Sequence, residues 1–168
     1  MEVPYHDHRC PPFLEAQINE VFVRRVLIDI GILVNLIPLQ VLTVVGIARH
    51  SITQSDTPII GFSNIAIPTI GYIQMDLKVG PVRSSTVFYA MDVNVSYDIL
   101  LGHPWLNKHR PIPSTYHQCV NGRIGNIVIR ILGNQFPFDI LSFMMILLPL
   151  ARMLFLDQSV LLCCNGKK

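Results

Sequence analysis

The sequence predicts a mostly β domain, a compact barrel or sandwich, that extends to about Leu132. Short runs rich in β-branched residues recur along the chain, and several of them alternate between apolar and polar residues as half-buried strands do. Turn-forming residues separate these runs at short intervals, which is typical of barrels and sandwiches. With 168 residues, 51% of them apolar and 14% charged, the chain can bury the core of one domain and is not of disordered composition.

The first predicted element is a hairpin over Phe13–Asp29. Its strands are "FLEAQI" and "VFVRRVLID", and the pair Asn19-Glu20 supplies the turn between them. "VNLIP" follows as a short buried strand. Pro38 then begins a short helix, "LQVLTVVG", which Gly46 ends.

The middle of the chain predicts two more hairpins and a second helix. In "PIIGFSNIAIPTIGYIQMDLKVG" two strand-like runs flank a tip near Gly61–Asn64, and a Gly-Pro turn then leads into "VRSSTVFYAMDV". "ILLG" is an apolar strand before a short helix, "HPWLNKHR", with Pro104 in its first turn. We expect "STYHQCV" and "RIGNIVIRIL" to form a closing hairpin about the turn Asn121-Gly122.

The two ends of the chain differ from this pattern. Residues 1–12 read as an irregular leader without the apolar segment of a signal peptide, so we expect an intracellular, cytoplasmic protein. Residues 139–168 form an apolar extension in which apolar and polar residues do not alternate. Its continuous apolar run is shorter than the roughly twenty residues needed to span a bilayer. Because this run also contains Pro149 and Arg152, we favour a helix packed on the barrel, or a non-native extension, over a membrane anchor.

Charge and cysteine content restrict the partners. The net charge is +2 and the cations are scattered, so no nucleic-acid partner is expected of this domain. "HDHRC" (His6–Cys10) places His and Cys close together, but a closed zinc site needs four ligands and no second cluster follows at a finger-like spacing. We therefore expect neither a metal nor another cofactor.

Asp29 is the most informative acidic residue, because it follows an apolar run in "RRVLIDIGILVNLIP". A carboxylate buried there would lose hydration, which costs several kcal/mol unless the group is protonated, paired or hydrogen-bonded. It is either a strand-end residue that caps a turn or a catalytic group. Asp92 and Asp98 are given no catalytic role, because "MDVNVSYD" reads as a loop with Asx turns. His117 and Cys119 would share a strand face, so a Cys–His nucleophile is conceivable.

Two motifs resemble those of retropepsin-like aspartic proteases. "VLIDIGILVNLIP" with a helix after it resembles their active-site strand and loop, and "SYDILLGHPWLNKHRPIPSTYHQC" resembles the second half of such domains in plant gypsy-type retrotransposon polyproteins. The family pattern there runs approximately "SYNLLLGRPWLH…VPSTLHQC". "IIGFSN…TIGYIQMDLKVG" resembles the flap region, and "GNQFPF" resembles the segment that closes the domain. The resemblance covers residues 13–138.

The resemblance implies a small closed β-barrel of the retropepsin type, with one or two short helices, that acts as a homodimer on an extended peptide or polyprotein. Each protomer would contribute one catalytic aspartate, Asp29. The two carboxylates would share a proton, so that one activates water and the other supports the oxyanion. The other implied site residues are the active-site loop (Ile30, Gly31, Ile32), the flap (Gly61, Phe62, Ser63, Asn64) and the second motif (Leu101, Gly102, His103).

The sequence departs from the family pattern beside the aspartate. Relatives usually have Thr, Ser or Gly where this chain has Ile30, Ser or Ala where it has Ile32, and Arg where it has His103; Leu33 adds further bulk. We expect these side chains to crowd the loop, since overpacking costs about 1–3 kcal/mol. Two hypotheses follow: an aspartic endopeptidase, and a catalytically inactive, dimerising relic of one.

Overall fold

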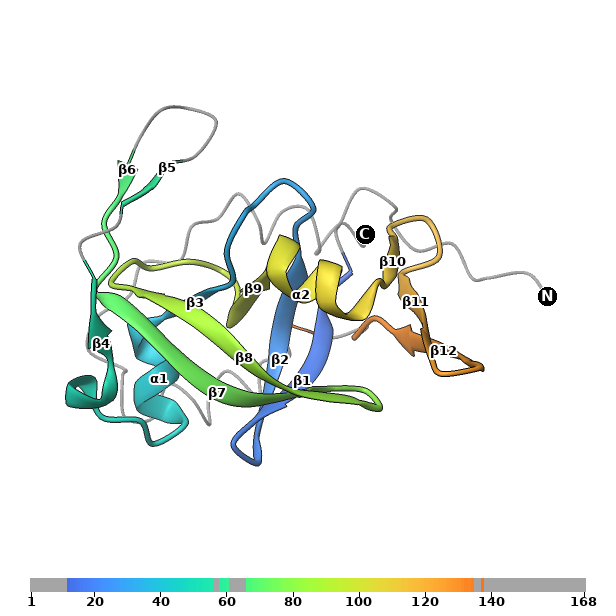
Figure 1. The fold of residues 1–168 in the computed structure, drawn as a ribbon, viewed down its shortest axis with the longest axis horizontal. Helices are drawn as coiled ribbons and strands as arrows, with labels where there is room; N and C mark the ends of the chain where they lie inside the picture. Colours follow the sequence, from blue (N-terminus) through green and yellow to red (C-terminus); the bar gives the residue numbers. More distant parts are fainter. Residues whose placement is uncertain (1–11, 56–57, 61–65, 135–136, 138–168) are drawn as a thin grey trace, which may run out of the picture.

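The computed structural model describes residues 12–55, 58–60, 66–134 and 137, and most of its elements are strands (Figure 1). In chain order they are β1 (Leu14–Ile18), β2 (Val21–Ile28), β3 (Leu36–Pro38), α1 (Leu39–Val44), the 3-10 turn η1 (Arg49–Ser51), β4 (Thr53–Gln54), β5 (Ile59–Ile60), β6 (Ala66–Ile67), β7 (Gly71–Val79), β8 (Val82–Met91), β9 (Ile99–Leu101), α2 (His103–His109), β10 (Ile112–Ser114), β11 (Cys119–Ile124) and β12 (Ile127–Leu132).

Six strands close into a barrel. The main sheet has the order β1-β2-β9-β3-β8-β7-β4, and β1 pairs with β7 as well as with β2. Closure removes the free edges of these six strands, because each then has a neighbour on both sides. The expectation of a mostly β protein with a small closed barrel and two short helices is confirmed.

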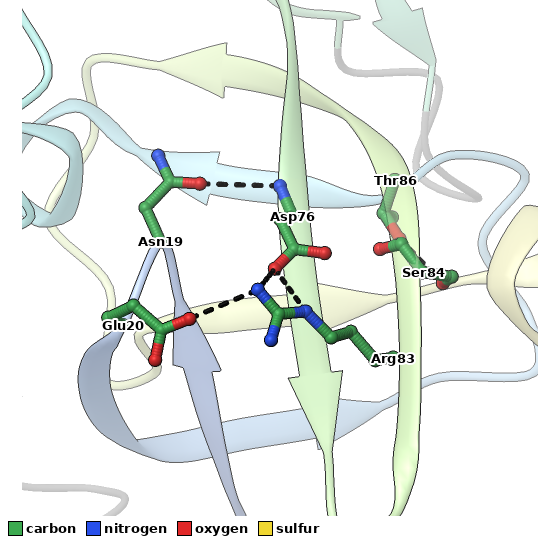
Figure 2. A network of polar contacts seen from close by, with 6 residues as sticks. All are labelled: Asn19, Glu20, Asp76, Arg83, Ser84 and Thr86. Carbon is green, nitrogen blue, oxygen red and sulfur yellow. Dashed lines mark hydrogen bonds and ion pairs between the residues drawn. The ribbon is translucent and has the colours of Figure 1, made fainter.

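The first hairpin was predicted correctly, and its turn also contacts the hairpin of β7 and β8. Asn19 and Glu20 have positive φ angles of 46° and 73°, as a tight two-residue turn requires. The Asn19 side chain accepts a hydrogen bond from the Asp76 amide, and the Arg83 guanidinium reaches both Asp76 and Glu20, at 2.7 and 3.0 Å (Figure 2). These ion pairs are exposed, so they contribute little to stability individually.

The core lies inside the barrel and under α2. Along β7 alternate residues are buried, from Gly71 to Val79, as the alternation of "YIQMDLKV" predicted. Phe88 from β8 and Trp105 from α2 are the largest fully buried side chains. Because Trp105 is 2% exposed, α2 is a packed part of the core.

A buried ion pair joins β2 to the start of β9. The Asp98 carboxylate accepts hydrogen bonds from the backbone amides of Arg24 and Arg25, at 3.1 and 3.0 Å, and from the Arg25 guanidinium at 3.0 and 2.6 Å. The two paired side chains are 18% and 7% exposed. The sequence predicted an Asx turn at Asp98; the residue instead fixes two strands of the barrel.

A second sheet, β10-β11-β12, follows α2, and here two predictions were wrong. Asn121 and Gly122 lie inside β11, and the turn is Gly125-Asn126, because the pairing Ile124↔Ile127 leaves only those two residues outside the ladder. Gly125 has a φ of +59°, which favours glycine. "STYHQCV" is not one strand, since residues 115–118 form a turn between β10 and β11.

Several predicted segments lie outside the described residues. They are the leader 1–11, the flap tip 61–65 and the apolar extension 138–168, so the expectations for a flap tip and for a packed C-terminal helix stay predictions. Pairing of β5 with β6 does bring together the two sides of the expected flap hairpin. Within the described ranges, no helix is long and apolar enough to cross a bilayer.

We predict that Asp98→Asn destabilises the domain by about 3 kcal/mol, because the charge of Arg25 would stay largely buried without its partner. Urea unfolding followed by circular dichroism measures this change. The matched control is Asp76→Asn, which removes a carboxylate from the exposed network in Figure 2 and should have a much smaller effect. Equal losses in the two variants would contradict the prediction.

Candidate active site

Asp29 lies one residue beyond the end of β2 and is held by two backbone contacts. Its amide donates to the Leu101 carbonyl at 3.0 Å, which extends the β2–β9 pairing by one step. Its carboxylate Oδ1 accepts from the Gly31 amide at 2.8 Å, the pattern of an Asx turn. Gly31 therefore fixes the direction of the carboxylate, and both interpretations of Asp29, turn cap and reactive group, are compatible with this position.

The expected burial of Asp29 was wrong for the single protomer. Asp29 is exposed, whereas Val26 and the strand β9 beside it are buried. The apolar run reflects burial of β2, and the aspartate comes where the chain leaves the barrel. In the described part of the chain no cation forms an ion pair with Asp29.

The bulky neighbours of Asp29 do not crowd the protomer, contrary to expectation. Ile30 is 68% and Leu33 is 76% exposed, so both side chains extend into solvent. Ile32 is partly buried and packs against the small cluster formed by Leu36, Met91 and Leu100. The loop thus presents apolar side chains on either side of Gly31.

The second motif lies directly against the Asp29 loop. A Cβ atom on Gly102 would lie 2.2 Å from the Val34 carbonyl oxygen and 2.6 Å from that of Ile32. The His103 amide donates to the same Ile32 carbonyl at 2.9 Å, while the His103 side chain is exposed. The Asp29 loop therefore passes so close to Gly102 that only glycine fits at this position.

Asn35 is a site residue that sequence reasoning missed. It is 3% exposed, and its side chain accepts from the Gly102 amide and donates to the Val87 carbonyl, both at 3.0 Å. It joins the end of the Asp29 loop to the second motif and to β8. A polar residue inside the buried strand "VNLIP" was the signal, because buried amides need hydrogen-bond partners.

Tyr97 was also missed, and it extends an apolar surface beside Asp29. Burial, with a smaller effect of the Asp29 charge, raises the pKa of Tyr97 to about 12. The phenol thus stays protonated at any pH where a carboxylate pair would act. Partly buried apolar side chains surround the same cluster: Leu27, Ile32, Val34, Ile59, Tyr89, Val93 and Val95.

The alternative Cys–His pair does not form. Cys119 is fully buried at the start of β11, and His117 lies in the preceding turn, where its Nδ1 contacts the Ser114 hydroxyl at 2.9 Å. Among the described residues, no three His, Cys, Asp or Glu side chains gather as a metal site would require. The flap residues Gly61, Phe62, Ser63 and Asn64 and the "HDHRC" segment lie outside the described residues.

Comparison with known proteins gives structural matches only. No protein-family model and no curated protein matches the sequence. The retroviral protease-like domain of Ddi1 from Leishmania major is similar in structure, with a TM-score of 0.57 and 17% identity over 77% of this chain and 97% of that one. EIAV protease, solved with the inhibitor HBY-793, has a TM-score of 0.50 and 17% identity over 62% of this chain and 92% of its own.

These matches define the class of fold. The chain has the fold of retropepsin-like aspartic protease domains, a closed six-stranded barrel with two short helices. At this level of identity the likeness concerns the fold. The chemistry of Asp29 therefore rests on its own geometry.

We predict that Gly102→Ala lowers the free energy of unfolding by about 2–3 kcal/mol, since the new methyl group would overlap two backbone carbonyls that cannot rotate away. Urea unfolding measures the loss. Gly122→Ala is the matched control: its Cβ would meet the Ile129 side chain at an ordinary 3.5 Å. A tolerated Gly102→Ala would show that the loop does not pass as closely as described.

Proposed function

We propose that the chain is an aspartic endopeptidase that acts as a homodimer, with Asp29 as its catalytic carboxylate. The observation that carries this proposal is the placement of Asp29: exposed, oriented by the Gly31 amide, fixed through its own amide to Leu101, and bordered by apolar side chains. A carboxylate in this position is accessible to substrate and is not neutralised by a cation within the described residues.

One such carboxylate is insufficient for the chemistry, so a second protomer is needed. When two carboxyl groups lie a few ångströms apart, both cannot ionise, and one keeps its proton. The ionised group would take a proton from water, which attacks the peptide carbonyl, while the protonated group donates to the developing oxyanion. The pair titrates as a unit, so its activity would require acidic to neutral pH.

Exposed apolar residues support the homodimer. Ile30 and Leu33 flank Asp29 at 68% and 76% exposure. A partner protomer placed over this loop would remove their apolar surface from water and would bring its own Asp29 to the same place. Covering these side chains is favourable by roughly 25 cal/mol per Å² of buried apolar surface.

The substrate would be an extended peptide, such as a segment of a polyprotein. The apolar surface around Tyr97 and Ile32 suits hydrophobic side chains, and the β5–β6 pair lies on the chain just before and after Gly61–Asn64, the expected flap. Backbone groups of a flap can pair with an extended peptide as an added strand. We assign Gly61, Phe62, Ser63 and Asn64 this role.

The alternative is a catalytically inactive, dimerising relic of the same fold. Ile30 favours it, because this side chain has no hydroxyl with which to hydrogen-bond near the carboxylate pair. His103 favours it as well: its exposed imidazole offers no permanent charge where relatives have Arg. Both proposals place two copies of Asp29 together and differ only in whether the pair reacts.

The origin and extent of the domain are part of the proposal. The motif around Leu101, Gly102 and His103 supports an origin in a plant gypsy-type retrotransposon polyprotein, with a protease domain over residues 13–138. The hydrogen bond from the Asn134 amide to the Phe13 carbonyl supports these limits, since it joins the two ends of the domain. Cys119, buried as a free thiol, is consistent with a reducing, cytoplasmic setting.

We predict that the full chain cleaves a mixture of extended peptides at acidic pH, is inhibited by pepstatin, and loses activity about a thousandfold in Asp29→Asn, because the pair would lose its general base. Mass spectrometry of the products measures cleavage, and light scattering reports the dimer. Asp92→Asn, at another exposed aspartate near a strand end, is the control and should retain activity. A dimer without any Asp29-dependent cleavage would eliminate the endopeptidase and leave the relic.

We further predict that the combined change Ile30→Thr, Ile32→Ala and Leu33→Ser raises the cleavage rate, by up to about tenfold, because a hydroxyl beside the carboxylate pair can add one hydrogen bond. The dimer dissociation constant should be measured in parallel, since the change also removes exposed apolar surface. Val44→Ser is the control, as Val44 is an exposed apolar residue on α1. An unchanged rate in a dimeric triple variant would show that these positions do not limit catalysis.

A further inference from the structure

A concave site separate from Asp29 lies on the part of the molecule formed by α2 and the three-stranded sheet. It is a cavity of about 310 Å³ between the C-terminal half of α2, the β7–β8 turn, and β11 with β12. Its lining includes no residue of the Asp29 loop and neither Gly102 nor His103. The volume is at the lower end of the range for small-ligand sites, enough for one ring or a branched side chain.

The lining of this cavity is mixed, with slightly more apolar than polar surface. Val82, Ile129 and Ile131 are half-buried and form its apolar walls, while Trp105 and Val120 border it but are 2% and 1% exposed and so offer it almost no free surface. Ile131 also packs against the β7–β8 turn: a Cβ on Gly80 would lie 3.0 Å from its side chain. The walls therefore come from elements that are packed against one another, which keeps the cavity in shape.

The mouth of the cavity is cationic. Arg83, Lys108 and Arg123 line it, and no carboxylate belongs to the lining. Arg83 is more than neutralised, since its guanidinium faces two carboxylates, those of Asp76 and Glu20, which do not belong to the lining (Figure 2). Lys108 donates only to the Ser85 carbonyl, and neither Lys108 nor Arg123 has a carboxylate partner in the described part of the chain.

His109 completes the polar part of the lining. Its Nε2 contacts the Ser84 hydroxyl at 2.9 Å, and its ring lies 5.2 Å from that of Trp105. Burial and the neighbouring Lys108 charge lower the pKa of His109, so the imidazole is neutral at neutral pH. The positive charge at the mouth thus comes from Lys108 and Arg123.

We propose that this cavity binds a small apolar carboxylate, with its aromatic or branched body against Val82, Ile129 and Ile131 and its carboxylate between Lys108 and Arg123. Charge complementarity selects an anion, because the unpaired charges at the mouth are both positive. The apolar walls favour a hydrophobic body, because removing apolar surface from water stabilises the complex. Either a free acid or the C-terminal residue of a peptide has this chemistry.

A matched pair of ligands tests the proposal on the full chain. N-acetylphenylalanine carries the carboxylate, and N-acetylphenylalaninamide has the same body without the charge. In ¹H–¹⁵N NMR titrations we expect the acid to give saturable shifts at the Trp105 indole N–H and at residues 108, 123 and 129–131, and to bind more tightly than the amide. Added salt should weaken the acid and leave the amide unchanged.

Substitutions of exposed cations test whether Lys108 and Arg123 bind the carboxylate of the ligand. Lys108→Gln and Arg123→Gln should each weaken the acid about threefold, as exposed ion pairs do, without affecting the amide. Arg130→Gln is the control: Arg130 is an exposed cation on β12 outside the cavity lining, and its loss should change nothing. Equal affinity for acid and amide, shifts that do not saturate, or equal weakening by Arg130→Gln would each overturn the proposal.

The same titration distinguishes the two sources of the ligand. A pentapeptide that ends in phenylalanine is the probe for a peptide C-terminus. Affinity equal to or above that of N-acetylphenylalanine supports a peptide end as the natural ligand. Weaker binding of the pentapeptide at the same residues supports a free small acid.

Discussion

The absence of a side chain at Gly102 is the constraint on which the candidate site depends. The loop that carries Asp29 leaves β2, passes over Gly102 and returns as β3, and its carbonyls lie where a Cβ would be. This crossing leaves the Gly102 amide facing the Asn35 side chain, which binds it. The backbone of Asp29 is thus positioned by packing around β9, and the Gly31 amide then fixes the direction of its carboxylate.

The two aspartates at the ends of β2 and β9 show how environment separates structural from reactive groups. Asp98 receives four hydrogen bonds and the charge of Arg25, so its carboxylate has no capacity left for a substrate. Within the described ranges Asp29 receives one hydrogen bond, from Gly31, and it is open to solvent. The Asp98–Arg25 pair joins β2 to the start of β9, whereas the Asp29 carboxylate stays accessible to solvent at the other end of β2.

Sequence patterns predicted the features that depend on neighbouring residues. They failed for features that depend on contacts between residues far apart in the chain. The Asn19-Glu20 turn and the alternation of β7 were readable because each follows from neighbouring residues. The partner of Asp98 is Arg25, 73 positions away, and no local pattern indicates it. The turn was misplaced because Asn121-Gly122 and Gly125-Asn126 have similar turn chemistry, and only the register of β11 with β12 distinguishes them. Asp29 was expected inside because its apolar run continues past the point where β2 leaves the barrel.

The apolar residues beside Asp29 can be explained by association of two copies as well as by a catalytically inactive relic. Ile30 and Leu33 are exposed in the protomer, where water makes large apolar side chains unfavourable and promotes association. At a contact between two copies, Ile30 and Leu33 would stabilise the dimer by burying apolar surface, whereas a residue with a hydroxyl group would do so through a hydrogen bond. Burial of apolar surface would also exclude water around the carboxylates and strengthen their interaction. In the proposed dimer, Ile30 and Leu33 would therefore affect how two copies associate before they affect whether Asp29 reacts.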